Sequence, residues 1–241
     1  MSLMKTKNLF KQDFQCKESM CTIISDKEDA IEAAISSIKS HREQLEKYIQ
    51  DHPKFLYSLE PIHVDKGPKI AKLMAEAAEK AGVGPMAAVA GVLADLAVED
   101  MVLNGAKVAV VENGGEAYAI SNRPIDIALS AGDSPLSKRI GFRLEHFPMG
   151  IATSSGLFSH ALSFGEAEAV TIFAENAGLA DAVATAVGNL MKGDDHRGAI
   201  ELGLNRGLSI SGVKGVFIIY REMIGRAGQV PLIIRINNTL L

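Results

Sequence analysis

The segment from residue 152 to residue 186 decides the fold, and it reads ATSSG at 152–156, SH at 159–160, AVTIFA at 169–174 and ADAVATA at 180–186. The third motif is an unbroken apolar run with β-branched residues, which is typical of a buried strand. The fourth is rich in alanine, which favours a helix. The segment therefore gathers a hydroxyl-rich turn, a histidine and a strand-to-helix unit into one short region.

Asp181 and Thr185 are the clearest chemical pair in this segment. They are four residues apart, so on a helix they project from the same face, one turn apart. A carboxylate and a hydroxyl are hard oxygen ligands that suit Mg²⁺, which completes its octahedron with water and phosphate oxygens. Two other roles compete with this one. Asp181 could interact with the dipole of its own helix, and Thr185 could bond back to the preceding turn.

Hydrophobic periodicity predicts further elements on both sides of this segment. A helical period predicts helices over residues 26–50, 68–82, 85–104, 177–192 and 196–205. In the second of these, Pro68 lies near the start and Gly82 at the end. Alternation and apolar runs predict strands over residues 20–24, 107–111, 116–120, 125–129, 140–144, 213–220 and 230–236. The last two strands read as a closing hairpin, and Pro231 places the final strand at a sheet edge. Long helices among hairpin-connected strands predict an α+β sandwich with a largely antiparallel sheet.

Composition sets the outer bounds of the function. The chain has 241 residues, of which 47% are hydrophobic, and a formal net charge of −4, which predicts one globular domain over residues 1–241. The absence of a basic run and of tryptophan argues against a nucleic-acid partner. The apolar run at 83–94 is too short to cross a bilayer, and no secretory pattern opens the chain. We expect a soluble, cytoplasmic protein with no membrane partner, in which Cys16 and Cys21 are reduced.

Several well-known site motifs are missing from the sequence, and the remaining candidates each have an ordinary structural reading. There is no P-loop, G-x-G-x-x-G, G-x-S-x-G or H-E-x-x-H motif. Gly114-Gly115 could approach a phosphate through backbone N–H groups or simply form a hairpin turn. The hydroxyls of Thr153, Ser154 and Ser155 could bond a nucleotide or their own backbone, and His160 could be a general base or a structural hydrogen-bonding residue.

The order of the four motifs from 152 to 186 resembles the C-terminal half of the ApbE-like family, whose best-known members are Mg²⁺-dependent FMN transferases that use FAD. The resemblance implies a T-fold-like sandwich and makes Asp181 and Thr185 the metal ligands. A second block agrees in spacing: Gly91, Asp95, Gly105 and Gly114-Gly115-Glu116 stand in the family's register, with Glu116 in place of an aspartate.

The chain also departs from the family pattern. The transferases usually read Asp-Leu-Gly-Gly-Ile-Ala-Lys-Gly where this chain reads GPMAAVAG at 84–91. Ala90 therefore stands in the place of the lysine, and Met86-Ala87 replaces the glycine pair. The Asp-Pro step that usually follows the Ser-His pair is replaced by Ser163-Phe164.

The resemblance leads to a specific expectation for the site. A ligand cleft is predicted where three segments meet, with Mg²⁺ and FAD as cofactors and His160 as the catalytic residue. The expected ligand-binding residues are Pro85, Met86, Ala87, Gly114, Gly115, Glu116, Thr153, Ser154, Ser155 and Gly156. The partner is a flavin or related nucleotide, and the prediction leaves room for a homodimer. Two functions stay open: transfer of FMN from FAD, and binding of a flavin-type or pterin-type ligand without transfer.

Overall fold

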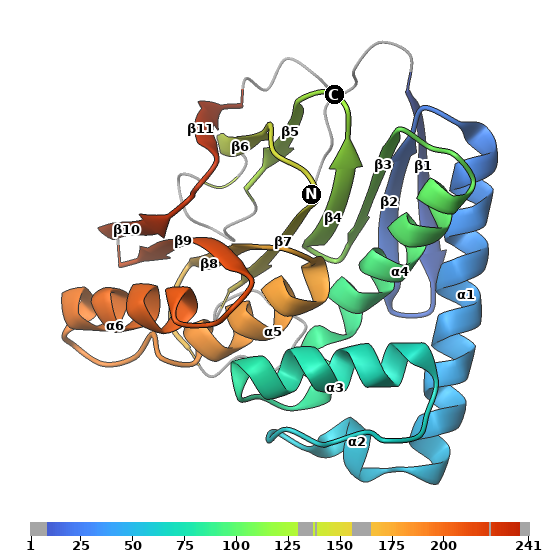
Figure 1. Cartoon of the computed structure of the whole chain (residues 1–241). Helices are drawn as coiled ribbons and strands as arrows, with labels where there is room; N and C mark the ends of the chain where they lie inside the picture. Colours follow the sequence, from blue (N-terminus) through green and yellow to red (C-terminus); the bar gives the residue numbers. More distant parts are fainter. Residues whose placement is uncertain (1–8, 130–136, 138, 156–164, 222, 237–241) are drawn as a thin grey trace.

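The computed structural model describes residues 9–129, 137, 139–155, 165–221 and 223–236. Within these residues, eight strands form a large antiparallel sheet in the order β1-β2-β3-β4-β7-β8-β9-β10, and three form a small sheet in the order β11-β6-β5 (Figure 1). The strands of the large sheet are β1 (Phe10–Cys16), β2 (Ser19–Ser25), β3 (Val108–Asn113), β4 (Glu116–Ser121), β7 (Met149–Ser154), β8 (Ala169–Ala174), β9 (Val213–Tyr220) and β10 (Met223–Gly228). The small sheet contains β5 (Ile125–Ala128), β6 (Ile140–Leu144) and β11 (Leu232–Arg235). The predicted α+β sandwich with a largely antiparallel sheet is therefore confirmed.

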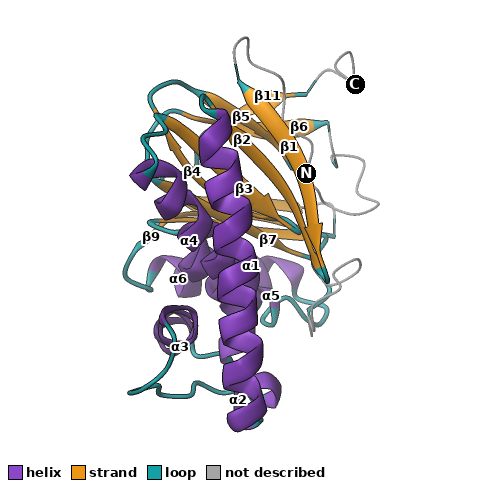
Figure 2. Cartoon of the chain, turned by 90° about the vertical axis from the view of Figure 1, so that its right-hand side faces the viewer, coloured by secondary structure: helices purple, strands orange, loops and turns teal. Residues whose placement is uncertain are grey.

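The helices lie on one face of the large sheet, in contact with its strands or with one another, and Figure 2 shows α1 and α4 on that face. They are α1 (Glu28–Asp51), α2 (Lys54–Tyr57), α3 (Lys69–Ala81), α4 (Val89–Leu103), α5 (Ala177–Gly188) and α6 (His196–Leu208), with the 3₁₀ helix η1 (Pro85–Ala88) leading into α4. Gly82 ends α3 in the left-handed conformation, as its position after the apolar period predicts. No single helix in the described part of the chain is long and apolar enough to cross a membrane, although α3 and η1–α4 together meet that test as a pair bent by 102°.

The large sheet separates two hydrophobic layers, because alternate residues of a strand point to opposite faces. On β3, Ala109 and Val111 pack into the layer that contains residues of α1 and α4. Val108 and Val110 pack into the layer that contains Phe142 of the small sheet. A strand buried on both faces reads as a continuous apolar run, which explains why β3 and β8 are easy to recognise in the sequence.

The predicted hairpin between residues 213–220 and 230–236 is wrong. β9 pairs instead with β10, from Gly228 opposite Gly215 to Met223 opposite Tyr220. β11 pairs with β6 at the edge of the small sheet. Strand β10 is missing from the sequence prediction because its pattern is weak: it contains two glycines, and one of them, Gly225, lies where a Cβ atom would come within 2.2 Å of Ile200.

Two further strands differ from the sequence prediction. β1 carries polar residues along its exposed face, so it lacks the apolar alternation of a half-buried strand, and it pairs with β2 at the edge of the sheet. The segment predicted as a turn at 152–156 begins as a strand, because Thr153 and Ser154 belong to β7 and lie opposite Thr171 and Val170 of β8. One of the hydroxyl groups that suggested a turn, that of Thr153, belongs instead to a cross-strand pair with Thr171.

Candidate functional site

Helices α4 and α5 approach each other closely at their N-terminal ends. A Cβ atom added to Gly91 would lie 2.2 Å from the carbonyl oxygen of Ala177, a distance that real side chains do not reach. Gly178 stands in the same position on the other helix, where a Cβ atom would lie 2.4 Å from Cγ2 of Val92. The glycines therefore let the two helix backbones touch.

Each helix gives a carboxylate to the first turn of the other. Asp95 of α4 accepts hydrogen bonds from the backbone N–H groups of Ala177, at 2.7 Å, and Gly178, at 2.8 Å. Asp181 of α5 accepts a hydrogen bond from the N–H group of Gly91, at 3.0 Å between Oδ2 and N. The first N–H groups of a helix have no partner inside the helix, so these carboxylates complete both starts and are favoured there by the helix dipoles.

This geometry bears on the structural role considered for Asp181, which is a contact to the start of its own helix. The start of α5 is capped by Asn176, whose side chain accepts a hydrogen bond from Leu179 N at 2.8 Å. Asp181 interacts with the start of α4 instead of with its own helix terminus. The interpretation of Asp181 as a contact to its own terminus is therefore wrong.

The β3–β4 turn is the third element near the crossing of α4 and α5, and it is followed directly by Glu116. Burial raises the pKa of Asp181 to about 7, and the charge of Asp95 adds to the rise. Burial also raises the pKa of Glu116 well above its usual value, and the charges of Asp181 and Glu112 add to the rise. The rise at Glu116 therefore reflects, beside burial, the negative charge of Asp181 on α5.

The β3–β4 turn is held on several sides. Gly114 N donates to the carbonyl of Met20 at 3.1 Å, and Gly115 N donates to Glu112 Oε1 at 2.9 Å. Both glycines have positive φ angles, 72° and 124°, which explains their type at this tight turn. A Cβ atom on Gly115 would lie 4.0 Å from the carbonyl oxygen of Thr153, so this turn lies beside the end of β7.

The remaining predicted residues are placed as follows. Met86 and Ala87 are half-buried in η1, while Pro85 is buried, and η1 contacts α5. The Thr153 hydroxyl lies 3.0 Å from the Thr171 hydroxyl. Ser155 is 9% exposed, and its Oγ has no hydrogen-bond partner within the described part of the chain. Thr185 is half-buried one turn after Asp181. Gly156 and His160 lie outside the described residues.

Several of the predicted segments lie beside one another in pairs. The 3₁₀ helix η1 contacts α5, which carries Asp181, and the Gly114–Glu116 turn lies beside the end of β7. The charge of Asp181 also contributes to the raised pKa of Glu116. Sequence reasoning missed Asn113, which is 3% exposed and donates from Nδ2 to the Ala90 carbonyl at 3.2 Å. Its position directly before the glycine pair was the available signal.

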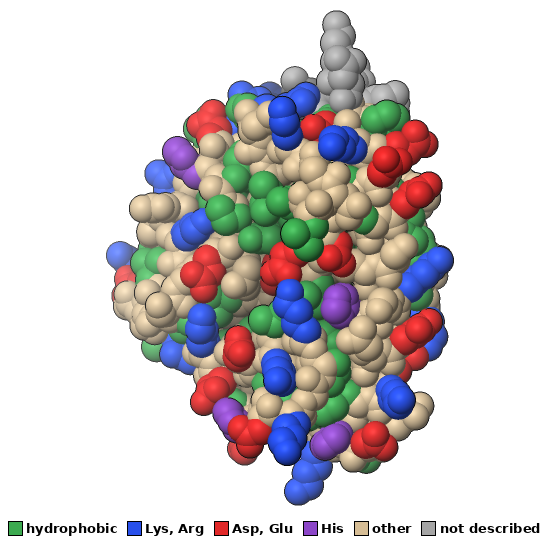
Figure 3. All heavy atoms as spheres, turned by 45° about the vertical axis from the view of Figure 1, so that its right-hand side comes forward, with side chains coloured by type: hydrophobic (Ala, Val, Ile, Leu, Met, Phe, Trp, Pro, Cys, Tyr) green, Lys and Arg blue, Asp and Glu red, His purple; other side chains and the backbone are tan. Residues whose placement is uncertain are grey.

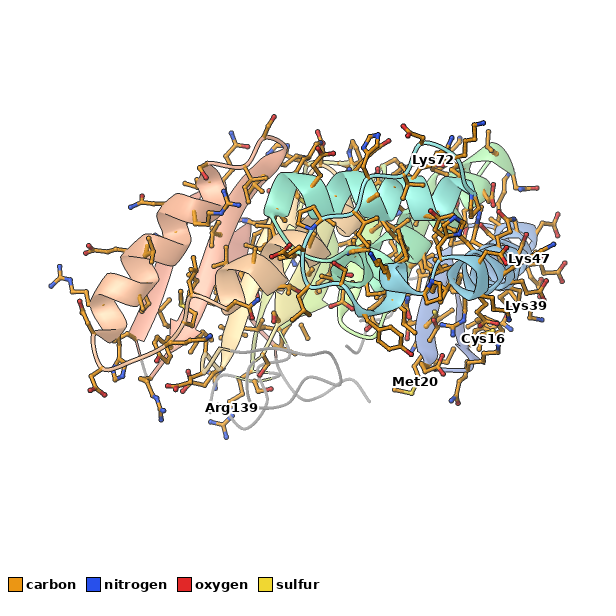
Figure 4. The ribbon with its side chains drawn as sticks, turned by 90° about the horizontal axis from the view of Figure 1, so that it is seen from below. Cys16, Met20, Lys39, Lys47, Lys72 and Arg139 are labelled. Carbon is orange, nitrogen blue, oxygen red and sulfur yellow. The ribbon has the colours of Figure 1, made fainter. Side chains whose placement is uncertain are left out.

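Two cavities lie close to this group of residues. One, of about 340 Å³, lies between α3, α4 and the start of α5 and touches Asp95. The other, of about 490 Å³, lies on β1, β2 and β3 and touches Gly114. Figure 3 shows acidic and basic side chains intermixed over the helical face. Seen from below in Figure 4, Lys39 and Lys47 of α1 and Lys72 of α3 project outward from the helices, and all three are exposed.

Comparison with known proteins agrees with the architecture. The model of a family described as "AbpE bacteria" matches residues 2–206. A UPF0280 protein of Methanococcus vannielii is 38% identical over 232 residues, covering 94% of each chain. A UPF0280 protein of Methanosarcina acetivorans is 40% identical over 228 residues, covering 93% of this chain and 89% of the relative.

Solved structures show the same fold at low identity. The ApbE protein of Thermotoga maritima matches with a TM-score of 0.66 and 15% identity over 91% of this chain and 97% of that one. The flavinyl transferase ApbE of Pseudomonas stutzeri, in its apo form, matches with a TM-score of 0.59 and 16% identity over 95% of both chains. The match over residues 2–206 shows that this chain belongs to the AbpE bacteria family, and it has the fold of ApbE proteins.

Proposed function

We propose that this protein binds a flavin nucleotide, FAD or a close relative, together with Mg²⁺ at Asp181 and Thr185. The observation that carries the proposal is the position of Asp181. Its carboxylate is held at the start of α4 by Gly91 and interacts with the charge of Glu116 from the β3–β4 turn. Support also comes from the fold, because solved structures with this fold include a flavinyl transferase.

The chemistry of the donor set fits Mg²⁺. Burial raises the pKa of Asp181 and of Glu116, and a bound cation would favour the charged form of each carboxylate. Within the described residues there is no group of three or more His, Cys, Asp or Glu side chains placed to hold a metal ion. One carboxylate and one hydroxyl would suit an ion that takes few protein oxygens and shares the rest with water and phosphate. Asp181 and Thr185 would hold the ion, and when bound it would neutralise negative charge on the ligand phosphates.

The other residues would serve the nucleotide. The Gly114-Gly115 pair has no side chain to keep a ligand away from the backbone. The buried Oγ of Ser155 has no partner in the described chain, so a ligand oxygen or nitrogen would satisfy it. Met86, Ala87 and Ala90 are half-buried and apolar at the entry to α4, which suits contact with a flat aromatic ring.

Transfer of FMN is the reaction expected if the protein is a catalyst. A bond would form between an acceptor oxygen and the FMN phosphorus, the bond from that phosphorus to AMP would break, and the acceptor proton would leave to a base. His160, which lies outside the described residues, stays the predicted base. Binding without transfer is the second candidate. Ala90 favours it, because no cationic side chain stands at that position to stabilise a charged transition state.

Calorimetric titration with FAD, with and without Mg²⁺, tests the proposal. We expect Mg²⁺-dependent binding by the wild-type protein and a loss of at least tenfold in affinity for Asp181→Asn. Asparagine keeps an oxygen for the Gly91 N–H group but removes the charge, so it separates metal binding from helix capping. Unchanged affinity would sink the metal site. Release of AMP from FAD by the wild-type protein would then identify a transferase, and its absence a binding protein.

A further inference from the structure

Asn113 is a polar residue in an unusual place. It is the last residue of β3, it is 3% exposed, and it has the same strand parity as Ala109 and Val111, which pack on the helical side. A buried amide is costly unless its donor and acceptor are both used. Both are used here, and the partners lie in two different elements.

The two hydrogen bonds define which way the amide points. Nδ2 donates to the carbonyl of Ala90 at 3.2 Å, and Oδ1 accepts from the thiol of Cys21 at 3.5 Å. The Ala90 carbonyl can only accept, so the reversed amide would place its oxygen against another acceptor and its NH₂ group against a sulfur that accepts only weakly. Burial raises the pKa of Cys21 to about 12, which keeps the sulfur protonated and able to donate at neutral pH.

The peptide bond between Ala90 and Gly91 links this amide to Asp181. Its carbonyl accepts from Asn113, and its N–H group donates to Asp181. These two groups belong to one planar unit and point in opposite directions. A hydrogen bond to the carbonyl orients that plane and polarises the N–H group, which strengthens the bond on the other side.

We propose that Asn113 is a positioning residue for Asp181, acting through the Ala90–Gly91 peptide. The amide ties the Gly114–Glu116 turn to the start of α4 and holds the peptide in the orientation that the Asp181 carboxylate requires. Cys21 supports this arrangement by holding the amide in one orientation. This inference rests on the proposed function for its effect on ligand binding, but the effect on the Gly91 N–H group is independent of any ligand.

The experiment combines amide hydrogen exchange at Gly91 with FAD titration at several Mg²⁺ concentrations. The variant is Asn113→Ala, and the matched control is Val111→Ala, a buried residue on the same face of the same strand. For Asn113→Ala we expect the protection of the Gly91 amide to fall about tenfold beyond the loss of global stability. We expect the Mg²⁺ concentration needed for half-maximal binding to rise about fivefold. For Val111→Ala, both should change only as global stability does.

Cys21 supplies a milder pair of variants if Asn113→Ala does not fold. Cys21→Ser keeps a donor and should preserve the protection of Gly91, whereas Cys21→Ala should reduce it about threefold. Equal protection of Gly91 in Asn113→Ala and Val111→Ala, or in the two Cys21 variants, would overturn the inference. If the wild-type protein binds no FAD in Mg²⁺, the proposed function fails, and hydrogen exchange alone still decides the role of Asn113.

Discussion

Asp95 and Asp181 make the same kind of contact at the crossing of α4 and α5, yet their surroundings differ. Asp95 is 7% exposed and gives both oxygens to backbone N–H groups of α5. Asp181 is only half-buried, is held by the start of α4, and interacts with the charge of Glu116. The comparison teaches that a carboxylate at a helix start is structural when backbone donors use both oxygens. For Asp181, which is less buried than Asp95, binding of a ligand is the role that we propose.

The largest effect should come from breaking both contacts together. Gly91→Ala places a Cβ atom against the Ala177 carbonyl, so α4 and α5 must separate and both carboxylates lose their partners. We expect the free energy of unfolding to fall by about 4 kcal/mol, or the protein not to fold at all. Urea denaturation measures it. Gly193→Ala is the control in an exposed loop, because no atom lies within 4 Å of a Cβ atom there. Its smaller loss of stability should come only from backbone strain at the positive φ angle. Equal losses in the two variants would contradict the packing argument.

Removing Asp95 alone should have the next largest effect. Asp95→Ala leaves two buried N–H groups at the start of α5 without a partner, at a cost of about 2–3 kcal/mol of stability. Urea denaturation of Asp95→Ala and Asp181→Ala sharpens the comparison. Asp181→Ala should lose less than about 1 kcal/mol of stability. Asp181 is less buried than Asp95, and the repulsion between its charge and that of Glu116 offsets part of its hydrogen bond to Gly91. A larger loss for Asp181→Ala would reverse the roles assigned to the two residues.

The pH dependence of stability should separate Asp181 from a neutral replacement. The pKa of Asp181 rises from an ordinary value near 3.9 to about 7 on folding. A raised pKa stabilises the folded state below about pH 4, and this stabilisation is lost as the pH rises through about 7. Relative to Asp181→Asn, the wild-type protein should therefore lose about 2 kcal/mol between pH 4 and pH 8, after allowance for partial exposure. Urea denaturation across this range measures the difference, and a flat difference would contradict the assigned shift.

The smallest effect is expected at Thr185. Thr185→Ala removes one oxygen from the proposed metal site and should raise the Mg²⁺ requirement for FAD binding about fivefold, which is about 1 kcal/mol. Stability should change by less than about 0.5 kcal/mol, because the residue is half-buried on the helix surface. Thr185→Ser keeps the hydroxyl and should bind as the wild-type protein does. Equal Mg²⁺ dependence in both variants would remove Thr185 from the site.

Much of the architecture could be predicted from periodicity, because strong local patterns report buried faces. The helices observed at Glu28–Asp51 and Lys69–Ala81 lie where their apolar periods place them. The edge elements were harder. β1 is polar and β10 contains glycines, and neither gives a clear period. The pairing of β11 with β6 could not be predicted, because a strand carries no local record of its distant neighbour.

By itself, the sequence determined the local geometry of the site: Asp181 and Thr185 one turn apart, Gly91 small enough for close packing, and Gly114-Gly115 in a tight turn. Only the tertiary structure decided which helix start each acid serves. Asp181 is 90 residues from Gly91, and Asp95 is 82 residues from Ala177. Asn113 entered the site in the same way, through a carbonyl 23 residues away. Helical spacing reports the face of a side chain, whereas its partner is set by packing between segments that are distant in the sequence.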